Sequence, residues 1–297
     1  MTLRQAELRA AARAKELLPD APAVARFVAG QLSDAGGFAG RDGQADLYFT
    51  HFALACLGAL GTAPPSAVAA WLETFGNGDD LDFVHRCALV RCRAHLDLPA
   101  SVAQRRAMLD ALNRHRSADG GFDLAVRAPR GSAYACYLAL GAHQDLGADL
   151  HDPRGLARCL AALRTPDGGY ANWPDSPAGS VPATAAALLV LHAISEPADR
   201  AARNWLAAQA SEDGGFRAAP VAPTADLLST AVALHALAET GGVPSACREP
   251  ALAFALGLRQ PSGSFRGHPL DDRSDCEYTF YALLALGQLA GATGDEP

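Results

Sequence analysis

The chain has 297 residues, of which 49% are hydrophobic and 19% charged, and its net charge is −7. A nucleic-acid-binding surface needs a basic patch to neutralise phosphates, and 25 basic against 32 acidic side chains argue against one. The apolar content excludes a disordered chain and is sufficient for a large core.

Nothing in the sequence predicts export or membrane insertion. Residues 1–20 mix charged residues and alanine without the continuous apolar centre of a secretion signal. No apolar run is long enough to span a bilayer. The seven cysteines are scattered through apolar segments and form no C-x-x-C pair. We therefore expect reduced, mostly buried thiols in a cytoplasmic protein.

From the N-terminus onward, two kinds of predicted helix alternate. Residues 1–20 are expected to form an N-terminal helix and residues 291–297 a flexible tail. Six segments carry the charges and should face solvent on one side: residues 21–32, 66–74, 102–116, 153–164, 199–210 and 250–259. Six Ala- and Leu-rich segments follow them, starting at Thr50, Val84, Ala133, Thr184, Thr230 and Thr279. When the first residue of each segment is counted as position zero, small or apolar residues recur at positions 0, 3, 4 and 7. This spacing is typical of a helix with one packed face.

A Gly-Gly-aromatic element joins the two helices of a pair. It occurs at residues 36–38, 120–122, 168–170 and 214–216, with a degenerate copy at 262–265. The first interval is nearly double the others, and the segment starting at Val84 fills it as a degenerate repeat. Asp-Gly-Gly is typical of a tight turn with positive φ.

The repeat predicts the fold. One helical pair cannot bury its own apolar face, so the pairs must stack on one another. Six pairs that close on themselves make an all-α (α/α)6 barrel, with residues 1–297 as a single domain. An open superhelix is the competing geometry.

Six helical hairpins with Gly-Gly-aromatic turns resemble the protein prenyltransferase β-subunit and squalene-cyclase repeat, to which class II terpene cyclases belong. The resemblance covers nearly the whole chain and implies the same barrel. Relatives with this barrel bind prenyl diphosphates and proteins, cyclise triterpenes, or serve as thioester-containing domains. The fold alone therefore does not define the reaction.

Helical geometry predicts which side chains line the lumen. When each inner segment is counted from zero, positions −2, 2 and 5 lie opposite the packed face. The aromatic and polar residues at these positions are Tyr48, Phe52, Tyr281, Asp82, Arg86, His235 and Glu277. His51 and Tyr134, at position 1, are expected at the edge of the lumen as hydrogen-bond donors. A mostly apolar lining with a few polar groups is typical of a small-molecule pocket; a lumen filled by side chains is the alternative.

The resemblance to zinc prenyltransferases implies a metal site made of Asp-x-Cys on one inner helix and His on the next. Asp226 matches the first ligand, but Leu228 stands at the cysteine position and Tyr278 at the histidine position. With two of three ligands missing, we expect a metal-independent protein without a cofactor, and zinc only under the prenyltransferase alternative. Tyr278 is assigned to substrate binding instead.

The resemblance to class II terpene cyclases implies an aspartate-rich motif whose central carboxyl group protonates an alkene or epoxide. The stretch from Asp275 to Thr279 is similar, with Glu277 in place of the central aspartate and Tyr278 in place of the last. A carboxyl group in an apolar lumen has a raised pKa and stays protonated. Glu277 is therefore the predicted proton donor, and Asp275 its tuning or orienting partner.

Asp82 is the alternative catalytic acid. Arg86 lies four residues further along the predicted helix, where the two side chains can pair. Such a pair would keep Asp82 ionised and would serve either as an anchor for a substrate head group or as a structural ion pair.

The sequence thus predicts a terpene-cyclase-like enzyme, a cyclase or isomerase that binds a hydrophobic isoprenoid or polyene and starts its reaction by proton transfer. Tyr48, Phe52 and Tyr281 would stabilise positive charge through their ring faces. The alternatives are a prenyltransferase β-subunit-like protein that acts with a partner chain, and a non-catalytic binding or scaffold barrel.

Two further expectations concern the mouth of the barrel. Most such cyclases complete their cavity with a second helical domain, so we expect a small substrate, or a homodimer or partner subunit that closes the mouth. Aspartates at the helix starts and the lack of a basic cluster predict a substrate that is neutral or has one modest anionic group, held by Arg86 or Arg273.

Overall fold

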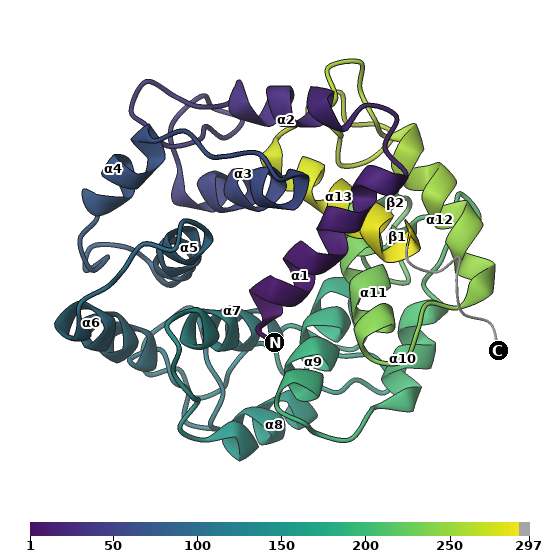
Figure 1. The fold of residues 1–297 in the computed structure, drawn as a ribbon. Helices are drawn as coiled ribbons and strands as arrows, with labels where there is room; N and C mark the ends of the chain where they lie inside the picture. The colour runs from purple at the N-terminus through teal and green to yellow at the C-terminus, as the bar shows by residue number, and fades with distance from the viewer. Residues whose placement is uncertain (291–297) are drawn as a thin grey trace.

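The computed structural model describes residues 1–290, which form a ring of helices around a central axis (Figure 1). The inner helices are α3 (Leu47–Leu60), α5 (Phe83–His95), α7 (Ala133–Asp145), α9 (Val181–Ala193), α11 (Leu227–Glu239) and α13 (Cys276–Ala290). The outer helices are α2 (Ala21–Ala29), α4 (Ala67–Glu73), α6 (Val102–Asn113), α8 (Pro153–Ala162), α10 (Arg200–Ala207) and α12 (Ser245–Gly257). The predicted all-α barrel of six helical pairs is confirmed.

Contacts between neighbouring inner helices run around the whole ring. Each inner helix packs on the next, from α3 through α5, α7, α9 and α11 to α13, and α13 packs back on α3. Alanines such as Ala187, Ala233 and Ala282 are fully buried in these helices, and their small side chains permit close packing. The ring is therefore closed, and the open superhelix is excluded.

The Gly-Gly-aromatic turns are held to the inner helices that follow them. The first glycine has a positive φ, 100° at Gly36 and 98° at Gly168, which residues with a Cβ rarely adopt. The aromatic residue is buried, and its backbone N–H donates to a threonine Oγ1 of the inner helix. This bond joins Phe38 to Thr50, Tyr170 to Thr184, Phe216 to Thr230 and Phe265 to Thr279.

These bonds and the helix caps correct the predicted register of two inner helices. In the third repeat, the Phe122 N–H reaches the Sγ of Cys136, so position zero is Cys136 rather than Ala133. In the second repeat, Asp82 caps α5 by accepting from the His85 N–H at 2.9 Å. Since the cap lies at position −4 in the other repeats, position zero of α5 is two residues later than predicted.

The outer layer closes in the same way, because each turn abuts the outer helix of the following repeat. A Cβ on Gly214 would lie 2.2 Å from the carbonyl oxygen of Pro250 in α12. The last turn meets the first outer helix: a Cβ on Gly263 would lie 2.6 Å from the backbone of Ala23 in α2. The sixth repeat is thus joined to the first in both layers.

The N-terminal segment lies across one end of the ring. It comprises α1 (Leu3–Ala12) and a 3-10 helix, η1 (Arg13–Glu16), and α1 crosses the centre of the view in Figure 1. The Leu3 N–H donates to Gln144 Oε1 at the end of α7, 2.7 Å away. A Cβ on Gly287, near the end of α13, would lie 1.8 Å from the carbonyl oxygen of Ala10. We call this end, where the inner helices finish, the floor, and the opposite end the mouth.

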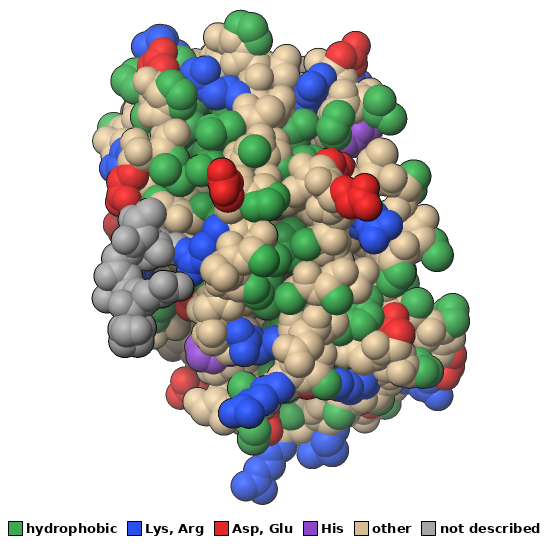
Figure 2. Space-filling model, turned by 90° about the vertical axis from the view of Figure 1, so that its right-hand side faces the viewer, with side chains coloured by type: hydrophobic (Ala, Val, Ile, Leu, Met, Phe, Trp, Pro, Cys, Tyr) green, Lys and Arg blue, Asp and Glu red, His purple; other side chains and the backbone are tan. Residues whose placement is uncertain are grey.

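The remaining regular structure is a short hairpin between α10 and α11, formed by β1 (Phe216–Arg217) and β2 (Ala225–Asp226). On the face shown in Figure 2, charged side chains of both signs are interspersed with apolar ones. No helix of residues 1–290 combines the length and apolar character needed to cross a membrane. The predicted tail, residues 291–297, lies outside the described residues.

Candidate active site

The ring encloses a cavity of about 300 Å³. Its wall is mostly apolar and includes six aromatic side chains: Tyr48, Phe52, Tyr134, Tyr137, Phe280 and Tyr281. Glu7 of α1 contributes to the wall at the floor. The lumen is therefore partly open rather than filled by side chains.

With the corrected register, the lining follows one rule around the ring. Positions −2, 1, 2 and 5 of the inner helices supply most of the wall, in three layers from mouth to floor, and Ala142 at position 6 of α7 is the exception among these helices. The mouth layer includes Tyr48, Val84, Tyr134, Pro182 and Leu228, and the floor layer includes Arg91, Leu189, His235 and Leu284. Tyr48, Phe52, Tyr281, His51, Tyr134 and His235 all line the cavity, as the sequence predicts.

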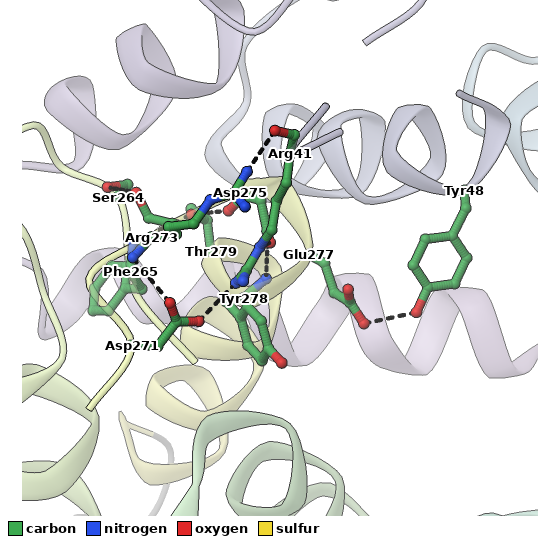
Figure 3. A network of polar contacts seen from close by, with 11 residues as sticks. Arg41, Tyr48, Ser264, Phe265, Asp271, Arg273, Asp275, Glu277, Tyr278 and Thr279 are labelled. Atoms are coloured by element: carbon green, nitrogen blue, oxygen red, sulfur yellow. Dashed lines mark hydrogen bonds and ion pairs between the residues drawn. The ribbon is translucent and has the colours of Figure 1, made fainter. Parts of the chain in front are cut away.

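Glu277 lies at the mouth, at position −2 of α13. The prediction that Glu277 lines the lumen is wrong, because it is not part of the cavity wall. Tyr48, which is part of the wall, donates a hydrogen bond of 2.6 Å to Glu277 Oε1 (Figure 3). Burial raises the pKa of Glu277 to about 7, against the opposing effect of the Tyr48 hydrogen bond. Burial and the neighbouring carboxylate also raise the pKa of Tyr48. The pair can therefore hold a transferable proton near neutral pH.

Asp275 occupies the N-terminus of α13 and does not touch the cavity. Its carboxylate accepts from the Tyr278 N–H at 2.9 Å and pairs with Arg41 Nε at 2.6 Å (Figure 3). Arg41 also bonds Asp271 at 2.9 Å. The negative charge of Asp275 contributes to the raised pKa of Glu277.

Aromatic rings surround the space below the Glu277–Tyr48 pair. Tyr48 and Phe52 meet edge to face with centroids 4.9 Å apart, and Phe52 and Tyr281 are 5.4 Å apart. Phe280 lies 5.8 Å from Phe52. Ring faces attract cations, most strongly where water is excluded, so this part of the cavity can stabilise a carbocation.

Charged residues that the sequence analysis missed line the floor. Arg91, at position 5 of α5, is 8% exposed and pairs with Glu7 at 3.0 Å and with Asp145 at 3.2 Å. Tyr137 donates to the other oxygen of Glu7, and Arg4 pairs with Asp145 at 2.9 Å. The error in the register of α5 concealed Arg91. Glu7 belongs to a helix outside the repeat, and no sequence signal placed it in the lumen.

Two histidines of the wall, the partly buried His51 and the buried His235, differ in their surroundings. His51 stacks on His95 with centroids 5.5 Å apart, and burial lowers the pKa of both. His235, at the floor, bonds the Gln288 amide nitrogen through Nδ1 at 2.7 Å. Burial also lowers the pKa of His235, so the ring is neutral near pH 7.

The prediction that Asp82 and Arg86 face the lumen is wrong, and so is their predicted ion pair. Asp82 caps α5, and its side chain is 64% exposed and bonded to His85. Arg86 occupies the position held by the turn-binding threonines, and its guanidinium donates to the carbonyl oxygens of Asp79 and Leu81. Asp82 therefore cannot be the acid of the cavity, and Arg86 secures the loop before α5.

Tyr278 and Arg273 also lie outside the cavity. The Tyr278 ring is half-buried against Gly267, with the Arg41 guanidinium 5.3 Å from its centroid. Arg273 is an exposed loop residue that donates to the Arg41 carbonyl oxygen. Neither reaches the cavity wall, so the substrate-binding roles predicted for them are not supported by the geometry.

The residues at the zinc position of prenyltransferases do not fit the metal. The carboxylate of Asp226 accepts from the backbone and hydroxyl of Ser229 at 2.7 and 2.8 Å. Leu228 lines the cavity and Tyr278 lies beneath Arg41, so neither supplies a ligand that zinc prefers. Residues 1–290 contain no group of three His, Cys, Asp or Glu side chains arranged to hold a metal ion.

A closed ring of six helical hairpins around an apolar cavity defines an α/α toroid. The family model of the prenyltransferase alpha-alpha toroid domain matches residues 10–75, 74–193 and 182–294. The chain therefore belongs to the prenyltransferase α/α toroid family. No curated protein matches the sequence.

Solved structures share the fold at low sequence identity. The type II terpene cyclase MstE from Scytonema superposes with a TM-score of 0.62 at 16% identity, covering 94% of this chain and 98% of that chain. A protein from Actinoplanes gives 0.64 at 18% identity, covering 97% and 100%. Candida albicans protein geranylgeranyltransferase-I gives 0.56 at 15%, covering 69% and 66%. At these identities the likeness concerns the fold, and the reaction has to be argued from the site.

Proposed function

We propose that this protein is a terpene-cyclase-like enzyme that binds a hydrophobic isoprenoid or polyene in the toroid cavity and drives a proton-initiated cyclisation or isomerisation. The observation that carries the proposal is the Glu277–Tyr48 pair, 2.6 Å apart at the mouth of an aromatic cavity. A carboxyl group with a pKa of about 7 is protonated often enough near neutral pH to act as an acid. No metal or cofactor is part of the proposal.

Tyr48 carries the proton from Glu277 into the cavity. Tyr48 donates to the ionised Glu277. Once Glu277 is protonated the hydrogen bond reverses, its carboxyl group donates to the Tyr48 oxygen, and the tyrosine proton is free for an alkene carbon of the substrate. A C–H bond forms there, Tyr48 receives the proton of Glu277, and Glu277 becomes a carboxylate. In an isomerisation the cation then loses a proton from a neighbouring carbon to water. In a cyclisation the π electrons of a second alkene first attack the cation, which forms the C–C bond of the ring and moves the positive charge to that alkene, and a proton is then lost to water in the same way. Glu277 is reprotonated from solvent.

The wall below the pair stabilises the cation. Phe52, Phe280 and Tyr281 present rings within 5.8 Å of one another, and their negative faces favour positive charge. Few polar groups reach this layer, so premature capture of the cation by water is limited.

Volume limits the size of the substrate. If each non-hydrogen atom occupies the ~30 Å³ share of a water molecule in the liquid, a cavity of about 300 Å³ holds about ten of them. A ten-carbon isoprenoid fits, and a longer one would extend through the mouth. This supports the expectation of a small substrate or of a homodimer or partner subunit over the mouth.

The ligands of solved relatives support an isoprenoid ligand. The structure of one MstE variant is a complex with geranylgeranyl dihydroxybenzoate as substrate, and that of another is a complex with merosterolic acid A as product. Candida albicans protein geranylgeranyltransferase-I has been solved in complex with GGPP. The misfit at the zinc position favours the cyclase type over prenyl transfer for this chain.

The test is turnover of a panel of acyclic isoprenoid hydrocarbons and alcohols, followed by gas chromatography. Glu277→Gln keeps a hydrogen-bond acceptor for Tyr48 but has no acidic proton to transfer, and we expect its turnover to fall at least a hundredfold. Tyr48→Phe should lose activity to a similar extent because the relay is interrupted. Glu196→Gln, the same change at an exposed glutamate outside the cavity, is the control. Turnover by Glu277→Gln equal to that of the unmodified enzyme would refute the assignment of the acid.

A further inference from the structure

The floor of the cavity carries the charged residues of the lining, whereas the middle of the lumen is mostly aromatic and aliphatic with His51 among its side chains. Arg91 of α5 and His235 of α11 both occupy position 5 of their helices and both line the cavity. In a ring of six inner helices α5 and α11 are opposite one another, so these two side chains approach the axis from opposite sides.

Both side chains retain unused hydrogen-bonding capacity. His235 is 1% exposed and its Nε2 has no partner among the described residues, while Nδ1 accepts from the Gln288 amide. With Nδ1 as acceptor, the neutral ring carries its proton on Nε2, which is then a donor. Arg91 uses Nε and Nη1 in its ion pairs, which leaves Nη2 as a further donor. The buried Nε2 of His235 is unsatisfied within residues 1–290, and because such a donor costs about 1–3 kcal/mol, a ligand atom that accepts from it is favoured.

The charge of the floor is balanced within the protein. Arg91 and Arg4 are paired with Glu7 and Asp145, so two cations face two carboxylates. No net positive charge is left to attract an anion, and a carboxylate ligand would lie close to Glu7. The free donors therefore suit an uncharged oxygen.

We propose that Arg91 and His235 form a binding subsite for a neutral oxygen group, a hydroxyl or carbonyl, at the end of the ligand that lies furthest from Glu277. The ligand class is therefore an oxygenated isoprenoid, which enters with its oxygen first and leaves an alkene beneath Tyr48. The proposal rests on the proposed function only for the isoprenoid skeleton, because the hydrogen-bonding argument concerns binding alone.

Calorimetric titration with three probes of one skeleton tests the subsite: geraniol, the hydrocarbon 2,6-dimethylocta-2,6-diene, and geranic acid. We expect the unmodified protein to bind geraniol at least tenfold more tightly than the hydrocarbon, a difference of about 1.4 kcal/mol. Geranic acid at pH 8 should bind no more tightly than geraniol. Equal affinity for geraniol and the hydrocarbon would overturn the proposal, as would tighter binding of the acid.

Variants at the floor separate hydrogen bonding from shape. In His235→Leu the tenfold preference for geraniol should fall below threefold, and His235→Gln, whose amide can reach the position of Nε2, should keep most of it. His192→Leu, the same change at an exposed histidine of α9 that does not line the cavity, is the matched control and should leave the preference unchanged. Because His235→Leu also leaves Gln288 without its partner, the double variant His235→Leu/Gln288→Leu is measured beside it. A preference retained in both would overturn the role of His235.

The outcome is independent of catalysis. A clear preference for geraniol without turnover of any substrate would leave the subsite standing and remove the proposed reaction. Turnover without any preference for the oxygenated probe would support the proposed reaction and overturn the subsite.

Discussion

The protonation of Glu277 makes a quantitative prediction about stability. Its pKa is about 7 in the folded protein and about 4.5 in an exposed carboxyl group. The native state therefore holds this proton over a pH range in which the unfolded chain has lost it. The resulting stabilisation is fully present below pH 4.5 and is lost as the pH rises through 7.

The magnitude follows from the two pKa values. At 1.36 kcal/mol for each unit of pKa, raising the pH from 5.5 to 8.5 removes about 2 kcal/mol of unfolding free energy through Glu277 alone. Glu277→Gln does not titrate and should lack this loss. Relative to the unmodified protein, the variant should therefore gain about 2 kcal/mol in stability between the two pH values.

Urea denaturation followed by circular dichroism measures the effect. The urea-induced unfolding of both proteins is measured at pH 5.5 and at pH 8.5. The change in unfolding free energy between the two pH values is then compared between the proteins, so that the contributions of all other titrating groups cancel. Tyr48→Phe is a second test: its hydrogen bond opposes the rise in the Glu277 pKa, so its removal should steepen the loss of stability with pH. The same pH dependence in Glu277→Gln as in the unmodified protein would refute the raised pKa, and with it the argument for Glu277 as an acid.

Three further predictions concern the framework of the site. Arg91→Met leaves the buried carboxylate of Glu7 without its cation and Asp145 with Arg4 alone, and it should cost about 3–5 kcal/mol of stability in urea denaturation; a loss below 1 kcal/mol would contradict the ion pairing. Gly287→Ala places a Cβ 1.8 Å from the carbonyl oxygen of Ala10, so amide hydrogen exchange in α1 should rise strongly, whereas unchanged protection would contradict the close packing of α1 on α13. Thr230→Val removes the acceptor of the Phe216 N–H and should lower stability by about 1–3 kcal/mol; an unchanged melting temperature would show that this bond contributes nothing.

The sequence predicted what the repeats share. Alternating helices, Gly-Gly-aromatic turns and apolar residues at the positions that face the lumen recur in most copies of the repeat. Several copies therefore support each inference. The positions of Tyr48, Phe52, Tyr281 and His235 in the wall followed from this common pattern.

The errors arose where a repeat departs from the pattern. The second repeat lacks the Gly-Gly-aromatic turn and offers two aspartates, Asp80 and Asp82, that could cap α5. Choosing the first moved Arg86 into the predicted lumen and Arg91 out of it. Hydrogen bonding decided between them in the structure, because the His85 N–H reaches Asp82.

Residues outside the repeat could not be placed from periodicity at all. Glu7 reaches the floor because α1 crosses the ring, and its ion pair with Arg91 joins positions 84 residues apart. No sequence spacing specifies such a contact, since it depends on the closure of the whole ring.

That closure also determines how the chain can acquire its structure during synthesis. The contact of Arg41 with Asp275 spans 234 positions, and α3 has no partner on one side until α13 has been made. The emerging chain therefore carries an open apolar edge through most of translation, when such edges are prone to associate with other chains. Once closed, the ring has no terminal repeat from which to fray, so its helices should be lost together rather than one pair at a time, unlike those of an open solenoid.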